Sequence, residues 1–192
     1  ITDAPLVIDT SDARALEAGL RAYPGRALIN SVSAEDNRIQ EFLPLAKKYG
    51  AAILCLPIRE EGVPKTAEAR FEAVQYILEH AKQYGLTEGD FLLDGLVMTV
   101  SADKNACREV LGTLRLYREH LGYPSTMGLS NISFGLPNRP LINSTFFAMC
   151  LAGGLDAPIM NPYDEKMQDA LMAANALLGT DPNGIEFSKN AA

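Results

Sequence analysis

The sequence predicts an α/β fold in which short buried strands, all parallel, alternate with amphipathic helices. Two observations support this prediction: six short apolar runs recur along the 192 residues, and the stretches between them have the period of a helix. The runs lie at 5–9, 27–30, 51–56, 91–94, 126–129 and 157–161. Each run is too short for a helix and too uniformly apolar for a half-exposed strand, so we predict a buried parallel strand at each.

The stretches between the runs place apolar residues three or four positions apart, as on one face of a helix. The three clearest faces are Ile39, Phe42, Leu43 and Ala46; Phe71, Val74, Ile77, Leu78 and Ala81; and Ala106, Cys107, Val110, Leu111 and Leu114. We expect Thr66 and Asp103 to cap the second and third of these helices. Further helices are predicted over 141–152 and 164–178.

The order of the elements leaves two closures open, because repeated βα units form either an open doubly wound sheet or a barrel. Eight units close a (β/α) barrel of about 250 residues, and this chain has six. No Gly-x-Gly-x-x-Gly turn follows the first run, which argues against dinucleotide binding. The chain begins almost directly in a strand, so we expect a barrel that lacks its first two units. We predict a barrel domain over 1–180 and a domain end or linker start over the turn-rich 181–192.

Composition narrows the range of partners. The formal net charge of −7 argues against a nucleic-acid partner, because phosphate binding requires a basic face. No apolar run approaches the roughly 20 residues that span a bilayer, and the N-terminal residues lack a basic region followed by an apolar one. The three cysteines lie far apart and form no Cys-x-x-Cys pair. We therefore expect a cytoplasmic protein with no metal site and no membrane partner.

Polar residues end four of the six predicted strands and follow a fifth, at the end where functional side chains of such folds lie. They are Asp9, Asn30, Asp94, Asn131 and Asn161. Any one of them would serve as a helix cap, but five together favour a shared ligand site. No Ser–His or Cys–His pair and no strand-end lysine accompanies them, which disfavours covalent catalysis. Carboxylates and amides suit a pterin, whose 2-amino group and neighbouring ring N–H form a two-donor edge that one carboxylate can accept.

The stretch from Gly128 to Arg139, GLSNISFGLPNR, resembles the Gly-x-Ser-Asn-x-Ser segment of the methyltetrahydrofolate methyltransferases. That family includes the folate domain of cobalamin-dependent methionine synthase and the methyltransferases that serve corrinoid iron–sulfur proteins. Segments at 8–10, 28–33, 61–67, 139–143 and 154–162 resemble the same family in the same order. The resemblance covers essentially the whole chain. It implies a pterin-binding (β/α)₈ TIM barrel of the dihydropteroate synthase-like type, entered here at the third strand.

The resemblance also implies an activity and a ligand site. The protein is expected to bind 5-methyltetrahydrofolate and to transfer the methyl group to the Co(I) of a cobalamin or other corrinoid on another domain or protein. Asp9, Asn30 and Asp94 would bind the pterin ring, and Gly128 would let the ring approach the backbone closely. Asn131 matches the family asparagine near pterin N5, the atom that carries the methyl group, and is the expected catalytic residue.

Two further residues, Arg139 and Asn161, are expected in the substrate site. Phe134 resembles the methionine synthase type of segment, where the methyltransferases of corrinoid iron–sulfur proteins often have Gln, so the resemblance favours the methionine synthase branch. Neither a corrin-binding signature nor a zinc-thiolate site is present in the sequence, which places both on other domains or chains.

The same residues bear on three alternatives to this function. Dihydropteroate synthase would carry a lysine where the Gly-Leu-Ser stretch ends, and Ser130-Asn131-Ile132 stands there instead. A phosphate-binding barrel enzyme needs a Gly-rich loop near the last strands, which Asn161-Pro-Tyr-Asp does not supply. The third alternative, an inactive folate-binding fragment, is not excluded by these residues. Because its strand edges would be unpaired, such a piece would dimerise, rearrange or aggregate.

Overall fold

The computed structural model of the protein describes residues 4–190, and six parallel strands in this range form one sheet. The strands are β1 (Val7–Asp9), β2 (Leu28–Ala34), β3 (Ala52–Arg59), β4 (Phe91–Asp94), β5 (Ser125–Gly128) and β6 (Ala157–Ile159). The predicted alternation of parallel strands and helices is confirmed. Residues 1–3 and 191–192, at the outer ends of the two predicted ranges, lie outside the described residues.

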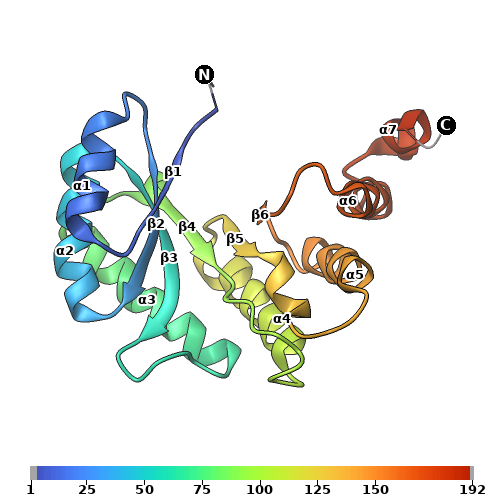
Figure 1. Ribbon diagram of the computed structural model, residues 1–192, viewed down its shortest axis with the longest axis horizontal. Coiled ribbons are helices and arrows are strands. Elements are labelled where there is room, and N and C mark those ends of the chain that lie inside the picture. The colour runs from blue at the N-terminus through green and yellow to red at the C-terminus, as the bar shows by residue number, and fades with distance from the viewer. Residues whose placement is uncertain (1–3, 191–192) are drawn as a thin grey trace.

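A helix connects each pair of successive strands, two helices follow the last strand, and the helices that pack on the sheet lie on its outer side (Figure 1). The helices are α1 (Ala13–Ala22), α2 (Asp36–Tyr49), α3 (Ala67–Gln83), α4 (Ala106–Leu116), α5 (Arg139–Ala152), α6 (Glu165–Leu178) and α7 (Ile185–Asn190). Short turns of helix occur at η1 (Glu88–Asp90), η2 (Tyr117–Leu121), η3 (Leu129–Ser133) and η4 (Pro182–Gly184). None of the helices within residues 4–190 is both long and apolar enough to cross a bilayer.

The strand order decides between the two closures that the sequence left open. The strands pair in chain order, β1-β2-β3-β4-β5-β6, without the reversal that marks a doubly wound sheet. The sheet is curled, with α1–α3 outside its first half and α4–α6 outside its second half (Figure 1). On the two edge strands Val7 and Ile159 are 52% and 48% exposed. This arrangement is a partial (β/α) barrel, as predicted.

The core lies between the sheet and the helices, in two clusters. One cluster joins the outer side of β1–β4 to α1, α2 and α3, and the other joins β5 to α4, α5 and α6. The three predicted helix faces point into these clusters, although Phe71, Cys107 and Leu111 are only partly buried. The helices therefore cover the convex side of the sheet and leave the concave side for other contacts.

The carboxyl ends of four strands, β2, β3, β5 and β6, differ from the predicted ones. The strand β2 continues to Ala34, so Asn30 lies within it rather than at its end, which corrects the prediction. The continuation is possible because Val32 and Ser33 pair with Cys55 and Leu56 of a longer β3, after a register shift that follows Ile29. The last strand is shorter than predicted and ends two residues before Asn161.

One of the two predicted helix caps is wrong. The Thr66 hydroxyl accepts a hydrogen bond from Ala69 N at 3.2 Å, so this cap is confirmed. The Asp103 carboxylate instead accepts from Asn105 N at 2.9 Å, within the turn that precedes α4. Because α4 begins at Ala106 and its N-cap residue is Asn105, the Asp103 side chain does not cap the helix, and Asp103 contacts the first turn only through its backbone oxygen, which accepts from Ala106 N at 3.0 Å.

The segment after 180, read from the sequence as turn-rich, contains a turn and the short helix α7. The Asp181 carboxylate is buried and accepts hydrogen bonds from Glu186 N at 3.2 Å and from Phe187 N at 3.0 Å. These bonds satisfy N–H groups at the start of α7, which explains why a polar segment is helical here. The domain boundary at 180 stays a prediction.

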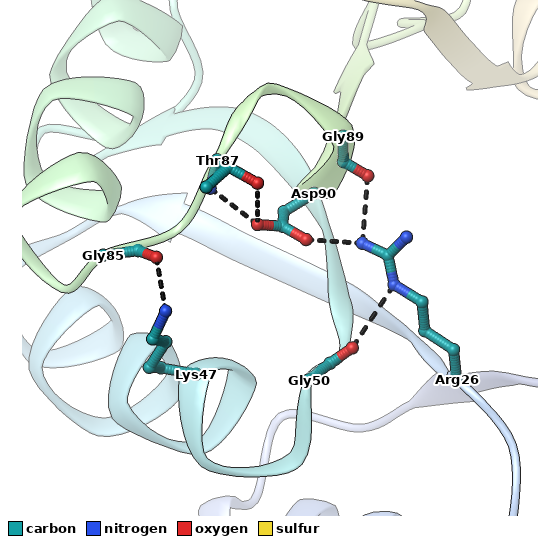
Figure 2. A network of polar contacts seen from close by, with 7 residues as sticks. All are labelled: Arg26, Lys47, Gly50, Gly85, Thr87, Gly89 and Asp90. Carbon is teal, nitrogen blue, oxygen red and sulfur yellow. Dashed lines mark hydrogen bonds and ion pairs between the residues drawn. The ribbon is translucent and has the colours of Figure 1, made fainter.

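A polar network at the amino-terminal ends of β2, β3 and β4 joins the segments that lead into these strands (Figure 2). The Arg26 guanidinium donates to Gly50 O at 3.3 Å and to Gly89 O at 2.9 Å, and it pairs with Asp90 at 2.5 Å. The Asp90 carboxylate also accepts from the backbone N–H and the hydroxyl of Thr87, at 2.6 and 2.9 Å. In barrels of this kind the amino-terminal face contributes stability rather than catalysis.

Replacement of Asp90 by alanine is expected to lower the free energy of unfolding by roughly 1–2 kcal/mol, because a capping carboxylate and the Arg26 pair are lost together. Burial acts to raise the pKa of Asp90, but the Thr87 hydrogen bonds and the charges of Arg26 and Lys47 outweigh it and lower the pKa below 3.8. The contribution of the Asp90 carboxylate to the free energy of unfolding is therefore present above pH 3.8 and is lost as the pH falls further.

Denaturant titration at pH 7 measures the effect of Asp90→Ala, with Glu88→Ala on the same exposed turn as the matched control. The control should leave the midpoint unchanged. A midpoint equal to that of the wild type in Asp90→Ala would show that the network adds no stability.

Candidate functional site

The concave face of the sheet gathers four of the residues that the sequence singled out. One residue in each of four strands packs outward against the helices: Ile8, Ile29, Leu93 and Met127. Side chains alternate between the two faces of a strand. The next residue in each of these strands therefore faces the concave side, and these residues are Asp9, Asn30, Asp94 and Gly128.

Asp9 and Asn30 are direct neighbours, because the register of β1 and β2 places them opposite each other. Both line a hollow of about 220 Å³ at this end of the sheet, with Leu56 and Ile58 of β3 on its apolar side. Within residues 4–190 the Asp9 carboxylate and the Asn30 carboxamide form no hydrogen bond. Two neighbouring polar side chains without protein partners are available to a ligand.

Larger hollows exist, but they hold none of the predicted site residues. One of about 730 Å³ lies against α3 and α4 on the outside of the barrel, and one of about 410 Å³ lies beside Arg118 and Asp156 at the amino-terminal end of β5. We place the site on the concave face because the unpartnered carboxylate and amide groups converge there. A partial barrel leaves that face open, so an enclosed cavity is not expected.

Asp94, at the end of β4, is the most buried of the candidate residues, with 9% of its surface exposed. Its Oδ1 accepts a hydrogen bond from Leu96 N at 2.7 Å. Burial raises the pKa of Asp94 from 3.8 to about 6, although the Leu96 N–H and the charge of Arg70 act in the opposite direction. Its Oδ2 has no partner among residues 4–190 and is not sealed from solvent. At neutral pH the group is therefore a carboxylate with one oxygen free to accept.

Asn131 lies in η3, the turn that follows β5, and is half-buried. Its backbone oxygen accepts from Phe134 N at 3.3 Å, whereas its carboxamide forms no hydrogen bond within residues 4–190. A Cβ added at Gly128 would stand 3.5 Å from the Asn131 Nδ2, which is an ordinary contact. The protein itself therefore does not require glycine at 128. A ligand that approaches the Asn131 amide closely would require it, and that role stays a prediction.

Arg139, the first residue of α5, holds the turn that carries Asn131. Its Nε donates to the Ser133 hydroxyl and its Nη2 to Ser130 O, both at 2.9 Å, and its guanidinium lies 4.5 Å from the centre of the Phe134 ring. Asn161 likewise uses its side chain locally, because its Oδ1 accepts from Tyr163 N at 3.1 Å. Direct contact of either residue with a ligand stays a prediction.

The loop after β4 and the loop after β5 are joined, which sequence reasoning did not foresee. The hydroxyls of Thr99 and Ser101 donate to Phe134 O at 2.6 and 2.8 Å, and Val100 N donates to Ile132 O at 3.0 Å. The segment that follows Asp94 is thereby fixed against the turn that contains Asn131. The two parts of the site are therefore held in one arrangement.

Arg70, on α3, was also missed. Its side chain is fully buried, and its guanidinium donates to Pro64 O at 3.2 Å and to Gly95 O at 3.4 Å. The sequence does contain a pattern that points to it, because Arg70 precedes Ala73 and Val74 by three and four residues and so shares the apolar face of α3. A charged residue on that face departs from the amphipathic rule.

The chemistry that the site offers is hydrogen bonding and charge. Within residues 4–190 no group of three or more His, Cys, Asp or Glu side chains is placed to hold a metal ion. The concave face presents two carboxylates and two carboxamides, which together suit a polar heterocycle with several N–H donors.

The chain matches one protein family and is similar to three known proteins. The family described as pterin binding enzyme matches residues 1–161. A methylcorrinoid:tetrahydrofolate methyltransferase of Eubacterium limosum is 34% identical in an alignment of 194 positions, gaps included. The alignment covers 97% of this chain and 70% of that protein. The methionine synthases of Mycobacterium tuberculosis and Mycobacterium leprae are 34% and 32% identical over 82% and 84% of this chain. The chain spans only 14% of the length of each methionine synthase.

Proposed function

Because the chain belongs to the pterin-binding enzyme family, we propose that it binds 5-methyltetrahydrofolate and transfers its methyl group to a corrinoid on another domain or protein. The observation that most supports this proposal is the set of carboxylate and carboxamide groups on the concave face that have no partner within residues 4–190 or, in Asp94, keep one oxygen free. The likeness to a methylcorrinoid:tetrahydrofolate methyltransferase over 97% of the chain supports the choice of folate and corrinoid.

In this proposal the pterin ring binds through its N–H edge. The free oxygen of Asp94 accepts from the 2-amino group or the neighbouring ring N–H, in a charge-assisted hydrogen bond. Asp9 and Asn30, side by side on β1 and β2, supply a second carboxylate and an amide that can both donate and accept. The ring would lie over Gly128, where the missing side chain leaves room beside the Asn131 amide.

Methyl transfer breaks the bond between N5 and the methyl carbon, and N5 keeps that electron pair. The corrinoid, when bound, supplies the Co(I) electron pair that forms the new bond to the methyl group. An amine is a poor leaving group, so N5 must gain a proton or a strong hydrogen bond as the bond breaks. We assign this hydrogen bond to the Asn131 carboxamide, which has no protein partner within residues 4–190, with the proton delivered through water.

The affinity for 5-methyltetrahydrofolate is expected to depend on pH through Asp94. Only the ionised carboxylate accepts from the pterin edge without offering a competing proton, and burial raises the pKa of Asp94 to about 6. Affinity should be constant well above pH 6 and should fall as the pH decreases through 6, by about tenfold per unit at the acidic limit.

Calorimetric titration from pH 5 to 8 tests both this dependence and the proposed binding. Asp94→Asn is the matched control, because it keeps the shape of the side chain and removes the titration. Any pH dependence that persists in Asp94→Asn belongs to the ligand or to other groups. An identical pH profile in the two proteins would exclude Asp94 from the pterin site, and an absence of binding at every pH would exclude the proposed function.

Two methyl acceptors are consistent with the same site, and we propose a corrinoid-binding domain or protein as the partner in both cases. The methylcorrinoid:tetrahydrofolate methyltransferase, of which this chain covers 70%, supports a separate corrinoid protein as the methyl acceptor. Phe134 and the two methionine synthases support an acceptor that serves methionine synthesis. Parallel assays with free cobalamin and with a purified corrinoid protein compare the two.

A further inference from the structure

Arg70 occupies a position on α3 where an apolar residue would be expected. A charged residue that is fully buried there needs a structural or functional explanation. Its guanidinium has no exposed surface, and a buried charge costs free energy unless it is paired and hydrogen-bonded. Its two hydrogen bonds go to the loops at the functional end of the sheet. Pro64 O belongs to the loop between β3 and α3, and Gly95 O belongs to the residue directly after Asp94.

The groups around Arg70 come from several elements and are mostly acidic. Burial lowers the pKa of Arg70, whereas the Tyr117 phenol, Glu109 of α4, Asp103 and Asp94 all raise it. Glu109 is itself fixed, because its carboxylate accepts from Ala67 N at 2.9 Å at the start of α3. The Tyr117 hydroxyl donates to the backbone oxygen of Asp94 at 3.1 Å. Arg70 therefore provides the positive charge in an acidic surrounding that includes the candidate ligand-binding carboxylate.

We propose that Arg70 is a positioning residue for Asp94: by joining the β3–α3 loop to Gly95, it holds the Asp94 carboxylate in place and sets a positive charge behind it. Arg70 does not touch the ligand in this arrangement and acts through Asp94. The part of the inference that concerns pterin binding rests on the proposed function. The part that concerns Asp94 does not, because it describes the ligand-free protein.

Loss of the Arg70 charge should raise the pKa of Asp94. The charge of Arg70 lowers the pKa of Asp94, against the larger effect of burial, and the balance is a pKa of about 6. Without that charge the pKa must move upward, and less of the carboxylate is ionised at neutral pH. A neighbouring opposite charge typically changes a carboxyl pKa by about one unit or more. Arg70 thus extends pterin binding toward lower pH.

The test compares Arg70→Gln with Arg70→Lys, because lysine keeps the charge and lacks the planar group that reaches both loops. In the ligand-free proteins, carbon-13 NMR of labelled aspartate follows the Asp94 carboxyl, which is identified by its absence in Asp94→Asn. The midpoint should rise by about one pH unit in Arg70→Gln and stay close to that of the wild type in Arg70→Lys. An unmoved midpoint in Arg70→Gln would overturn the inference.

Affinity for 5-methyltetrahydrofolate is measured on the same variants. At pH 6 the affinity of Arg70→Gln should be several-fold lower than that of the wild type, with a smaller difference at pH 8. An equal loss at both pH values would mean that Arg70 has only a structural role. If Arg70→Gln does not fold, Arg70→Lys decides alone: a midpoint that rises by a full unit although the charge is kept would contradict the inference, and a midpoint near 6 would support it.

These outcomes separate the inference from the proposed function. A raised Asp94 midpoint in a protein that binds no 5-methyltetrahydrofolate would leave the role of Arg70 intact and would exclude the proposed ligand. Normal binding together with an unmoved midpoint would leave the function intact and would exclude the role of Arg70.

Discussion

Replacement of Asn131 by alanine is expected to slow methyl transfer from 5-methyltetrahydrofolate by roughly 100- to 1,000-fold and to leave the affinity for the folate nearly unchanged. The physical reason is that the hydrogen bond to N5 strengthens as the methyl group departs, so it stabilises the transition state more than the ground state. Removing one such preorganised donor typically raises a barrier by about 2.7–4 kcal/mol. The turn that holds Asn131 should survive the change, because Arg139 contacts Ser130 and Ser133 rather than Asn131.

Single-turnover kinetics measure the methyl-transfer step, and calorimetry measures folate affinity in the same preparation. Asn105→Ala is the matched control, because Asn105 is an exposed asparagine whose side chain forms no cap hydrogen bond with α4. The control should transfer methyl groups at the wild-type rate. An Asn131→Ala rate within a few-fold of the wild type, with folate bound, would remove Asn131 from the mechanism.

The Asp94→Asn substitution should cause the largest loss of folate affinity. The Oδ1 of the introduced asparagine can still accept from Leu96 N, so its amide NH₂ would take the place of the free carboxylate oxygen. That group donates, and it would face the N–H donors of the pterin. Truncating one partner of a buried charged hydrogen bond typically costs about 2–5 kcal/mol, so we expect the affinity to fall by a factor on the order of 30 or more.

The stability of Asp94→Asn distinguishes a binding role from a folding role. The folded-state pKa of Asp94, about 6, exceeds its ordinary value of 3.8, so the folded state binds the proton more tightly than the unfolded state. The stability of the wild type therefore rises as the pH falls from about 6 toward 3.8, and above pH 6 the ionised group is a cost.

The neutral side chain of the Asp94→Asn variant would not carry that cost. At pH 8 the variant should be at least as stable as the wild type in a denaturant titration, and the difference should shrink at pH 5. A marked loss of stability at pH 8 would mean that weakened folate binding reflects damage to the fold instead.

The parts of the structure that were predictable depend on local patterns. The strand at 91–94 was predicted at its observed bounds, because a uniformly apolar run ended in Asp94 and turn residues. The alternation of strand and helix followed from the same short-range pattern, and so did the places of Asp9 and Asp94 at the ends of their strands. The end of β2 was missed because Ser31 and Ser33 are polar, and only the pairing with a longer β3 makes these residues part of a strand.

The parts that were not predictable depend on contacts between distant segments. The Thr99 hydroxyl and Phe134 O are 35 residues apart, and no periodicity in either segment indicates that they meet. Arg139 was expected to contact the substrate, and only the structure shows that its donors reach Ser130 and Ser133. Arg70 differs from these cases, because its place on the apolar face of α3 could have been read from the sequence.

We propose that this protein transfers a methyl group from 5-methyltetrahydrofolate to a corrinoid. The most direct measurement mixes the protein with 5-methyltetrahydrofolate and free cobalamin reduced to Co(I), and follows the visible absorbance of Co(I) together with the formation of tetrahydrofolate. We predict that Co(I) is consumed in equal amount to the tetrahydrofolate formed, at a rate that saturates with folate and falls sharply in Asn131→Ala. An unchanged Co(I) spectrum, in a protein shown by calorimetry to bind the folate, would contradict it.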